Sequence, residues 1–417
     1  MTATADVLLH ERVVGSLTQD DRGQWAFRFV EAYRRSPERP TLGQKFEDNL
    51  SGVYRGKRGS LPPFFSNLVP EPEGELRPIL EAHLGVAEGD DITLLERLGR
   101  DLPGAVEVRA ASVASEGRLA GLVETVDPTE PVDPDGEWMR FSLAGVQLKF
   151  SVIMAEDKIT LPVQGRLGDW LVKFASRRFP GLCENEFAIM QWARRAGFDV
   201  PETILRPASA LIGTLGEHAE PGTYVLAVRR FDRDDGGRKI HQEDLAQVVN
   251  LLPEHKYDHY SYEDIVQIVA ATVGDAAGEE MIRRLTLMIA SGNGDAHLKN
   301  WSLVYPDRVR ATLSPLYDQV ATIAWPQQVA RTLALNLGGT KSMSQIGRAT
   351  MVTFAARIGW DSARVSSIVD ATIERLAHAW TECERAKDWP LLPDHAAALR
   401  QHWTTTPLLQ SGPLVRR

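Results

Sequence analysis

The first half of the chain alternates between short apolar runs and polar turns, whereas the second half repeats its hydrophobic residues with helical spacing. Near the N-terminus, Val7–Leu9 and Trp25–Phe29 have the composition of short strands. Helical patterns follow at Leu76–Leu84 and Thr93–Leu98. This mixture predicts a small α/β subdomain over residues 1–125.

A stretch rich in proline and aspartate, Asp127–Gly136, interrupts the pattern and predicts a domain boundary. Beyond it, three segments run apolar or alternate like strands: 141–154, 169–174 and 224–228. A helical pattern between the last two covers 184–197 and stops at a glycine, Gly197. We therefore expect residues 138–233 to form a second, strand-rich lobe.

From Gln242 onward the pattern is mostly helical. The predicted helices are Tyr262–Val273, Gly278–Ala290, Thr350–Ile358 and Asp361–Ala386. Residues 234–417 are thus expected to form a helical lobe that is joined to the strand-rich lobe near Arg230–Arg233. A strand-rich lobe followed by a helix-rich lobe is the layout of a bilobal nucleotide kinase, so the predicted fold class is α+β.

Composition, net charge and cysteine content limit the possible classes of function. The chain has 417 residues, of which 43% are hydrophobic and 25% charged, and its formal net charge is −9. This charge argues against independent nucleic-acid binding through bulk electrostatics, and leaves a local basic patch or a DNA-binding partner as alternatives. The two cysteines, Cys183 and Cys383, lie far apart, and no signal peptide or membrane-spanning run is found, so we expect a cytoplasmic protein.

The strongest candidate chemistry lies in Gly292–Leu303, where Asp295 precedes Asn300 by five residues. This is the spacing of a kinase catalytic loop, in which the aspartate orients the acceptor hydroxyl and the asparagine holds a metal ion. A capped turn after a helix gives the same short motif, so the spacing alone does not decide. A later carboxylate, Asp318, favours the kinase interpretation, and oxygen ligands suit Mg²⁺.

Three further candidate site residues each have two possible interpretations. Lys173 either faces solvent from an edge strand or binds the phosphates of ATP, with Glu184 or, preferably, Glu186 as its partner because Glu186 lies within the helix. His297 has no second histidine or cysteine nearby, which disfavours a metal ligand. Lys299 lies either beside the transferred phosphate or in solvent.

The segment Ser142–Lys149 contains a single glycine, Gly145, and differs from the G-x-G-x-x-G loop of protein kinases. By pattern alone it is a strand, a turn and a strand. In a phosphate loop, Lys149 would supply the positive charge. The segment 257–262 is rich in tyrosine, and none of these motifs assigns it a function.

Together these residues resemble the HipA toxins, the serine/threonine kinases of bacterial type II toxin–antitoxin modules. The family's S-[IL]-A-G-x-Q-x-K loop matches Ser142 to Lys149, and its D-x-H-x-K-N segment matches Asp295 to Asn300. Its P-x-Y-D segment matches Pro315 to Asp318. Further similarity lies in 63–70, 95–104, 184–187, 197–201, 230–233 and 241–244, so the resemblance covers nearly the whole chain.

The resemblance implies a role for each matching residue. Asp295 corresponds to the catalytic aspartate, and Asn300 and Asp318 correspond to the Mg²⁺ ligands. Ser142 corresponds to the serine that such kinases autophosphorylate to switch themselves off. The remaining implied positions contact ATP: Gly145, Gln147, Lys149, Lys173, Val228, Arg229, Phe231, His297 and Lys299. Arg229 departs from the family, which commonly has a glutamate there, and this puts a side-chain contribution at the hinge in doubt.

The resemblance also implies partners. A small helix-turn-helix antitoxin of the HipB type would neutralise the kinase and bring it to operator DNA, and aminoacyl-tRNA synthetases are the implied substrate class. One alternative is an aminoglycoside-type phosphotransferase, which Ser142–Lys149 and the N-terminal subdomain disfavour. The other is a non-catalytic, kinase-like co-repressor. The intact set of Lys173, Asp295, Asn300 and Asp318 disfavours that alternative.

Overall fold

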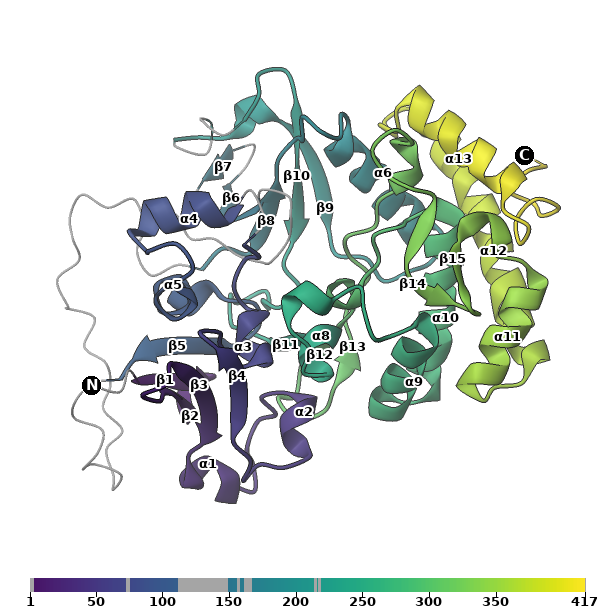
Figure 1. The fold of residues 1–417 in the computed structure, drawn as a ribbon. Helices are drawn as coiled ribbons and strands as arrows, with labels where there is room; N and C mark the ends of the chain where they lie inside the picture. The colour runs from purple at the N-terminus through teal and green to yellow at the C-terminus, as the bar shows by residue number, and fades with distance from the viewer. Residues whose placement is uncertain are drawn as a thin grey trace.

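The computed structural model of the chain describes residues 4–72, 76–111, 149–155, 158–160, 167–213, 216 and 219–416. The chain folds into three parts: a purple N-terminal sheet with its helices at the lower left, a second sheet above it, and a green to yellow helical part on the right (Figure 1). The structure is therefore of the predicted mixed α and β type. The predicted boundary at 127–136, with the domain limits 125 and 138, lies outside the described residues.

The N-terminal part is built on a five-stranded antiparallel sheet of order β4-β3-β2-β1-β5. Its strands are β1 (Thr4–Leu9), β2 (Arg12–Gln19), β3 (Gln24–Phe29), β4 (Tyr54–Arg58) and β5 (Val106–Ala110). Its helices are α1 (Glu31–Arg35), α2 (Gln44–Glu47), α3 (Pro63–Ser66), α4 (Leu76–Leu84) and α5 (Asp91–Leu98). Between sheet and helices, Phe27, Phe46, Phe64 and Phe65 are almost completely buried and pack in tilted and edge-to-face contacts as one aromatic core.

The second part is a five-stranded antiparallel sheet of order β7-β6-β8-β10-β9. Its strands are β6 (Lys149–Ala155), β7 (Lys158–Thr160), β8 (Trp170–Lys173), β9 (Thr203–Pro207) and β10 (Tyr224–Arg229). Strand β8 lies in the centre, where Lys173 pairs in register with Lys149 on one side and Leu226 on the other. The alternative of a solvent-facing lysine on an edge strand therefore does not hold, and Lys173 is only 4% exposed.

Helix α6 (Leu182–Arg195) joins this sheet to the helical part. Its residue Trp192 is buried and donates from Nε1 to the carbonyl of Leu376 at 2.8 Å. The Trp192 ring packs against Trp380 and Trp403, with ring centroids 5.2 Å and 6.1 Å away. Three tryptophans from three separate helices thus form the centre of the helical core.

The helical part contains α8 (Leu245–Val248), α9 (Tyr262–Val273), α10 (Asp275–Ser291), α11 (Arg348–Ile358), α12 (Ser362–Arg385) and α13 (Pro393–Thr405). A three-stranded sheet, β11 (His241–Asp244), β12 (Ser302–Tyr305) and β13 (Thr312–Leu313), and the pair β14 (Thr332–Leu337) and β15 (Thr340–Ser342) complete it. The short 3₁₀ helices are η1 (Gly99–Asp101), η2 (Ala208–Ala210), η3 (Pro253–His255), η4 (Leu298–Asn300), η5 (Thr322–Ala324) and η6 (Met343–Gln345). Within the described ranges, no helix is long and apolar enough to cross a membrane.

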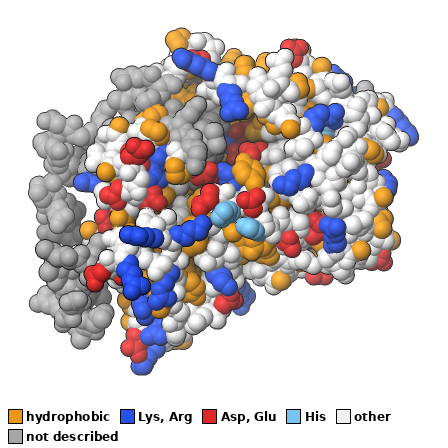
Figure 2. Space-filling model, in the orientation of Figure 1, with side chains coloured by type: hydrophobic (Ala, Val, Ile, Leu, Met, Phe, Trp, Pro, Cys, Tyr) orange, Lys and Arg blue, Asp and Glu red, His pale blue; other side chains and the backbone are white. Residues whose placement is uncertain are grey.

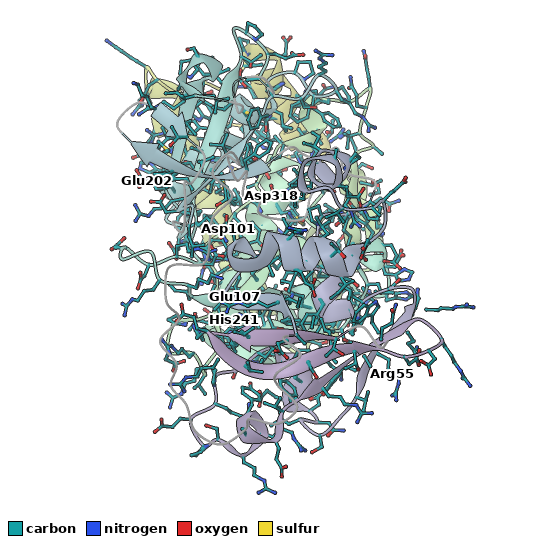
Figure 3. All side chains as sticks on the ribbon, turned by 90° about the vertical axis from the view of Figure 1, so that its left-hand side faces the viewer. Arg55, Asp101, Glu107, Glu202, His241 and Asp318 are labelled. Carbon is teal, nitrogen blue, oxygen red and sulfur yellow. The ribbon has the colours of Figure 1, made fainter. Side chains whose placement is uncertain are left out.

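A buried cluster of four charges connects the N-terminal part to the end of β10. Asp101 Oδ1 accepts from Arg230 Nη1 at 2.9 Å and from Arg233 Nη2 at 3.1 Å. Asp232 Oδ2 accepts from the same two guanidinium groups at 2.8 Å and 2.9 Å, and from the backbone N–H of Gly104 at 2.8 Å. Figure 3 shows Asp101, with Glu107 and His241, along the boundary between the N-terminal sheet and the rest of the molecule.

Removing one carboxylate from this cluster should destabilise the fold strongly. Asp101→Ala leaves two buried guanidinium groups with one carboxylate, and we expect a loss of about 3–5 kcal/mol in the free energy of unfolding, measured by urea denaturation. The control is Asp370→Ala, which breaks the exposed Arg348–Asp370 pair and should cost less than about 1 kcal/mol. Equal losses in the two variants would contradict the structural role of the cluster.

A second contact between the N-terminal part and β11 depends on pH. Glu243 is completely buried, and its Oε1 accepts from the backbone N–H of Gln44 at 2.8 Å and from the Tyr305 hydroxyl. Burial raises the pKa of Glu243 from its ordinary 4.5 to about 8, although both hydrogen bonds act in the opposite direction. The folded protein therefore keeps a proton on Glu243 at neutral pH that the unfolded chain releases.

This proton predicts how stability changes with pH. Because the pKa of the folded state is raised, the contribution of Glu243 is fully present below pH 4.5 and is lost as pH rises toward about 8. Its contribution should fall by about 1.4 kcal/mol per pH unit in that window, and Glu243→Gln should abolish this fall. Urea unfolding of both proteins at several pH values measures the difference. Parallel stability curves for the two proteins would show the prediction to be wrong.

Candidate active site

A cavity of about 750 Å³ lies between the second sheet and the helical part. Its size is typical of pockets for small ligands. All three parts of the molecule line it, with Glu71 from the N-terminal part, Lys173 and Val228 from the second sheet, and Asp295 and Asp318 from the helical part. In Figure 2, acidic and hydrophobic side chains gather around a hollow in the middle of the visible face.

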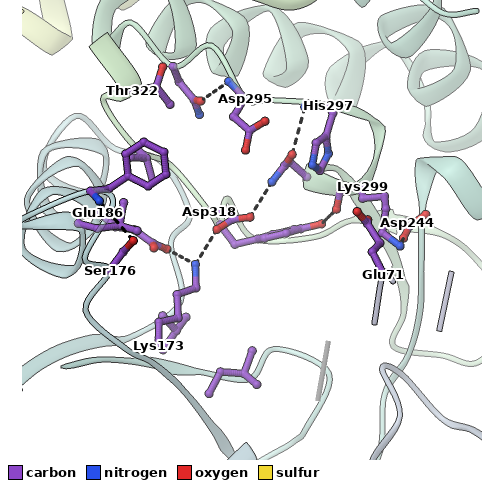
Figure 4. A pocket seen from close by; sticks show the side chains of 18 of the residues that line it. Glu71, Lys173, Ser176, Glu186, Asp244, Asp295, His297, Lys299, Asp318 and Thr322 are labelled. Carbon is purple, nitrogen blue, oxygen red and sulfur yellow. Dashed lines mark hydrogen bonds and ion pairs between the residues drawn. The ribbon is translucent and has the colours of Figure 1, made fainter. Parts of the chain in front are cut away.

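The segment that carries Asp295 is fixed by short-range hydrogen bonds. Helix α10 ends at Ser291 and is capped by Gly292, whose φ of 62° lies in the left-handed region that favours glycine. The backbone N–H of Gly294 then donates to Thr322 Oγ1 at 2.8 Å, and that of Asp295 donates to Asn293 Oδ1 at 3.0 Å. The capped turn expected from the sequence is therefore present, and it places Asp295 on the wall of the cavity (Figure 4).

Lys173 forms the ionic centre of the cavity. Its Nζ donates to Glu186 Oε1 at 2.5 Å and to Asp318 Oδ1 at 2.6 Å (Figure 4). Burial alone would lower the pKa of Lys173, but the charges of Asp318 and Glu186 outweigh it and raise the pKa above its ordinary value. Lys173 therefore stays charged. Of the two candidate partners in the following helix, Glu184 and Glu186, Lys173 binds Glu186.

Asp318 also contacts Asn300. Asn300 Nδ2 donates to Asp318 Oδ2 at 2.7 Å, while Asn300 Oδ1 accepts from the backbone N–H of His297 at 3.1 Å. Side-chain oxygen atoms of this kind are the ligands that Mg²⁺ prefers. In the described part of the chain, no three His, Cys, Asp or Glu side chains are grouped to hold a metal. A Mg²⁺ ion at Asn300 and Asp318 would therefore need phosphate or water ligands as well.

His297 and Lys299 line the cavity and contact other side chains of the protein. Burial lowers the pKa of His297 well below its ordinary value, so the ring is neutral, and it meets the Tyr257 ring edge-on at 5.0 Å. Lys299 Nζ donates to the backbone carbonyl and the side-chain oxygen of Asn67 at 3.2 Å and 3.0 Å. Lys299 is thus buried against the N-terminal part rather than solvated.

The hinge residues lie at the end of β10. Val228 is buried and lines the cavity with Phe231, whose ring packs on Tyr317 at 5.4 Å. The backbone N–H of Arg229 donates to the carbonyl of Glu202 at 2.8 Å, and its guanidinium reaches the exposed Asp235 at 2.9 Å. The arginine that departs from the family pattern therefore has its partner at the surface, although the residue also lines the cavity.

Four residues of the candidate set belong to the Ser142–Lys149 segment. Ser142, Gly145 and Gln147 lie outside the described residues. The backbone of Lys149 begins strand β6, opposite Lys173. Their assignments therefore remain predictions.

Several residues of the site escaped the sequence analysis. The Tyr257 hydroxyl donates to Asp295 Oδ1 at 2.7 Å. Thr322 Oγ1 accepts from the backbone N–H of Gly294, which directly precedes Asp295. From the N-terminal part come Asn67, which binds Lys299, and Glu71, which binds Lys256 Nζ at 2.5 Å. The tyrosine-rich stretch was a signal for Tyr257, and Asn67 lies in the 63–70 stretch that supports the family resemblance.

This arrangement, with a lysine–glutamate pair in one lobe and an aspartate loop with an Asn–Asp pair in the other, is that of a bilobal protein-kinase-like fold. The sequence matches the HipA-like C-terminal domain over residues 141–380 and the HipA N-terminal domain over residues 5–109. The chain belongs to the HipA family, as the sequence motifs predicted.

Similar proteins agree with this assignment. The Sinorhizobium fredii protein named "Putative kinase Y4dM" is 39% identical over 409 residues, which is 97% of each chain. The serine/threonine-protein kinase toxin HipA of Shewanella oneidensis is 26% identical over 352 residues, covering 77% of this chain and 75% of that protein.

A solved complex of Shewanella oneidensis HipA and HipB with operator DNA contains a similar structure. It has a TM-score of 0.71 at 21% identity, covering 99% of this chain and 96% of that chain. The predicted fold class is thereby confirmed.

Replacing Lys173 tests the ionic centre. Lys173→Met leaves the buried Glu186 carboxylate without its cation, and we expect a loss of about 3–5 kcal/mol in the free energy of unfolding. The double variant Lys173→Met/Glu186→Gln should recover most of that loss, because the uncompensated charge is removed. The control is Lys45→Met, in the exposed Lys45–Asp48 pair, which should cost less than about 1 kcal/mol. Additive effects of the two site substitutions would contradict the coupling.

Proposed function

We propose that this chain is an ATP- and Mg²⁺-dependent serine/threonine protein kinase that acts as the toxin of a type II toxin–antitoxin module. The observation that carries the proposal is the convergence of Lys173–Glu186, Asn300–Asp318 and Asp295 on one cavity between the lobes. Phosphoryl transfer needs cations on the phosphates, oxygen ligands for Mg²⁺ and a carboxylate for the acceptor hydroxyl. The cavity offers a residue for each task.

The lysine side of the cavity would bind the triphosphate. Lys173 has three N–H donors, of which Glu186 and Asp318 take two, so a phosphate oxygen can take the third. Lys149, with Gly145 and Gln147 in the same segment, would add contacts to the phosphates, as the family resemblance implies. Lys299 binds Asn67 and would bound this region, as would the His297 ring, which packs against Tyr257.

The hinge side would bind the adenine. Val228 and Phe231 offer apolar surface there, and Arg229 would contribute its backbone. Asn300 and Asp318 would hold Mg²⁺, which when bound neutralises phosphate charge.

Asp295 would act on the acceptor. Its carboxylate accepts a hydrogen bond from the acceptor hydroxyl and takes the proton as the acceptor oxygen forms its bond to the γ-phosphorus. The bond from that phosphorus to the oxygen of the departing ADP breaks in the same step. The cavity wall at Asp295 is near the exposed Tyr257, so an acceptor reaches it from solvent.

The toxin role extends this chemistry to regulation. Phosphorylation of Ser142 would add nearly two negative charges beside the triphosphate site and so disfavour triphosphate binding. A HipB-like helix-turn-helix antitoxin would neutralise the kinase and carry it to operator DNA, which suits a chain with a net charge of −9. The HipA–HipB–operator complex with a similar fold supports this partnership. Aminoacyl-tRNA synthetases in the cytoplasm are the proposed substrates, and translation inhibition is the outcome.

One experiment separates a kinase from a non-catalytic co-repressor. Asp295→Asn should lower phosphate transfer from radiolabelled Mg²⁺-ATP by about 10²–10⁴-fold, because the attacking hydroxyl then lacks a carboxylate to take its proton. In the wild-type protein, mass spectrometry should find the phosphate on Ser142. The same substitution should relieve growth arrest on induction, while Asp388→Asn, at an exposed position, should leave both readouts unchanged. Growth arrest by Asp295→Asn equal to that of wild type would overturn the catalytic mechanism.

A further inference from the structure

One hydroxyl of the protein already contacts the proposed catalytic carboxylate. Tyr257, in the segment between η3 and α9, donates its phenol proton to Asp295 Oδ1 at 2.7 Å. Tyr257 lines the cavity and is 38% exposed, and Asp295 beside it is exposed as well. An acceptor that uses Oδ1 of Asp295 must therefore displace the Tyr257 hydroxyl.

Two further contacts hold the Tyr257 ring in place. The His297 ring meets it edge-on at 5.0 Å with an interplanar angle of 81°. Lys256 Nζ lies 5.4 Å from the ring centroid, within range of a cation–π contact. Lys256 is in turn bound to Glu71 Oε2 at 2.5 Å, and both side chains are nearly buried. The N-terminal part of the molecule therefore reaches Asp295 through Glu71, Lys256 and Tyr257.

The Tyr257 hydroxyl lies at the distance from Asp295 that is required of a substrate hydroxyl. A hydroxyl that gives its proton to a catalytic carboxylate must lie about 2.6–3.2 Å from it. The Tyr257 hydroxyl satisfies this distance, donates in the required direction and comes from the solvent side of the cavity. A hydroxyl on a bound protein that uses Oδ1 of Asp295 therefore competes with the Tyr257 hydroxyl for that oxygen.

We propose that the Tyr257 phenol occupies the acceptor-hydroxyl position and thereby selects the acceptor. This inference rests on the proposed kinase function. Water is small and makes few contacts, so it does not displace a phenol that is held by Asp295, His297 and Lys256. A serine or threonine on a docked protein segment has the binding energy of the rest of that segment to displace it. Tyr257 thus protects ATP from hydrolysis when no protein acceptor is bound.

The test uses water as the acceptor. The full-length protein is incubated with Mg²⁺-ATP and without a protein substrate, and ADP release is measured. Tyr257→Phe keeps the ring and removes the hydroxyl, so water can take its place on Asp295 Oδ1, and ATP hydrolysis should rise by about tenfold, the worth of one hydrogen bond to a charged group. The KM for ATP should stay unchanged, because Tyr257 lies on the acceptor side.

Two further variants connect the effect to the N-terminal part. Glu71→Gln weakens the hold on Lys256 and should raise ATP hydrolysis in the same direction by a smaller factor. The double variant Glu71→Gln/Tyr257→Phe should hydrolyse ATP no faster than Tyr257→Phe, because both changes act through one phenol. Tyr260→Phe is the matched control, since Tyr260 lies in the same segment but outside the cavity lining, and it should leave hydrolysis unchanged.

The outcomes separate this inference from the proposed function. A wild-type protein that transfers phosphate to Ser142, together with a Tyr257→Phe variant whose ATP hydrolysis is equal or lower, would overturn the inference and leave the kinase assignment standing. Tyr257 would then be a positioning residue that orients Asp295. An absence of phosphate transfer and of ATP hydrolysis in wild type and all variants would overturn the kinase assignment, and the inference with it.

Discussion

The buried cluster of Asp101, Arg230, Asp232 and Arg233 is the constraint on which the arrangement of the three parts depends. Removing four charges from water is costly, and the cost is offset only where every charge finds well-placed partners. Here each carboxylate binds both guanidinium groups, and the backbone N–H of Gly104 is a further donor to Asp232. Because Asp101 belongs to the N-terminal part and Arg230 directly follows β10, no other relative placement of the two satisfies the cluster.

This placement makes the N-terminal part a wall of the active site rather than an appendage. It brings Asn67 to Lys299 and Glu71 to Lys256, so that two lysines beside the catalytic segment have partners in a distant part of the sequence. Without Glu71, the Lys256 ammonium would be buried without a carboxylate partner, and without Asn67, Lys299 would keep only Asp244 Oδ2 at 3.8 Å. The family's N-terminal and C-terminal domains thus occur together in this chain for a physical reason, since the charges of one are satisfied by the other.

The sequence predicts what is local and misses what is assembled from distant segments. Helices α4 and α9 have the predicted limits, because amphipathic spacing and a capping serine, Ser261, are written in consecutive residues. Strands β2, β5 and β9 were missed, because their pairing depends on partners elsewhere. The Asp295–Asn300 motif could be predicted for the same reason, because its residues are close together in the sequence. The pairing of Lys173 with Glu186 could be predicted because the helix that carries Glu186 comes directly after the strand that carries Lys173. The Lys299–Asn67 contact spans 232 positions and leaves no periodic trace in either segment.

Both sides of the site are already satisfied by internal contacts. On the phosphate side, Asp318 gives one oxygen to Lys173 and the other to Asn300, so the residues proposed to hold Mg²⁺ hold each other. On the acceptor side, Tyr257 donates to Asp295. A ligand must therefore replace charge-assisted hydrogen bonds, which are roughly twice as strong as neutral ones. A triphosphate with its metal ion can do so on one side, and a docked hydroxyl can do so on the other. Water brings no additional contacts and cannot replace the Tyr257 hydrogen bond. The same polar network that preorganises the site therefore also excludes water as an acceptor.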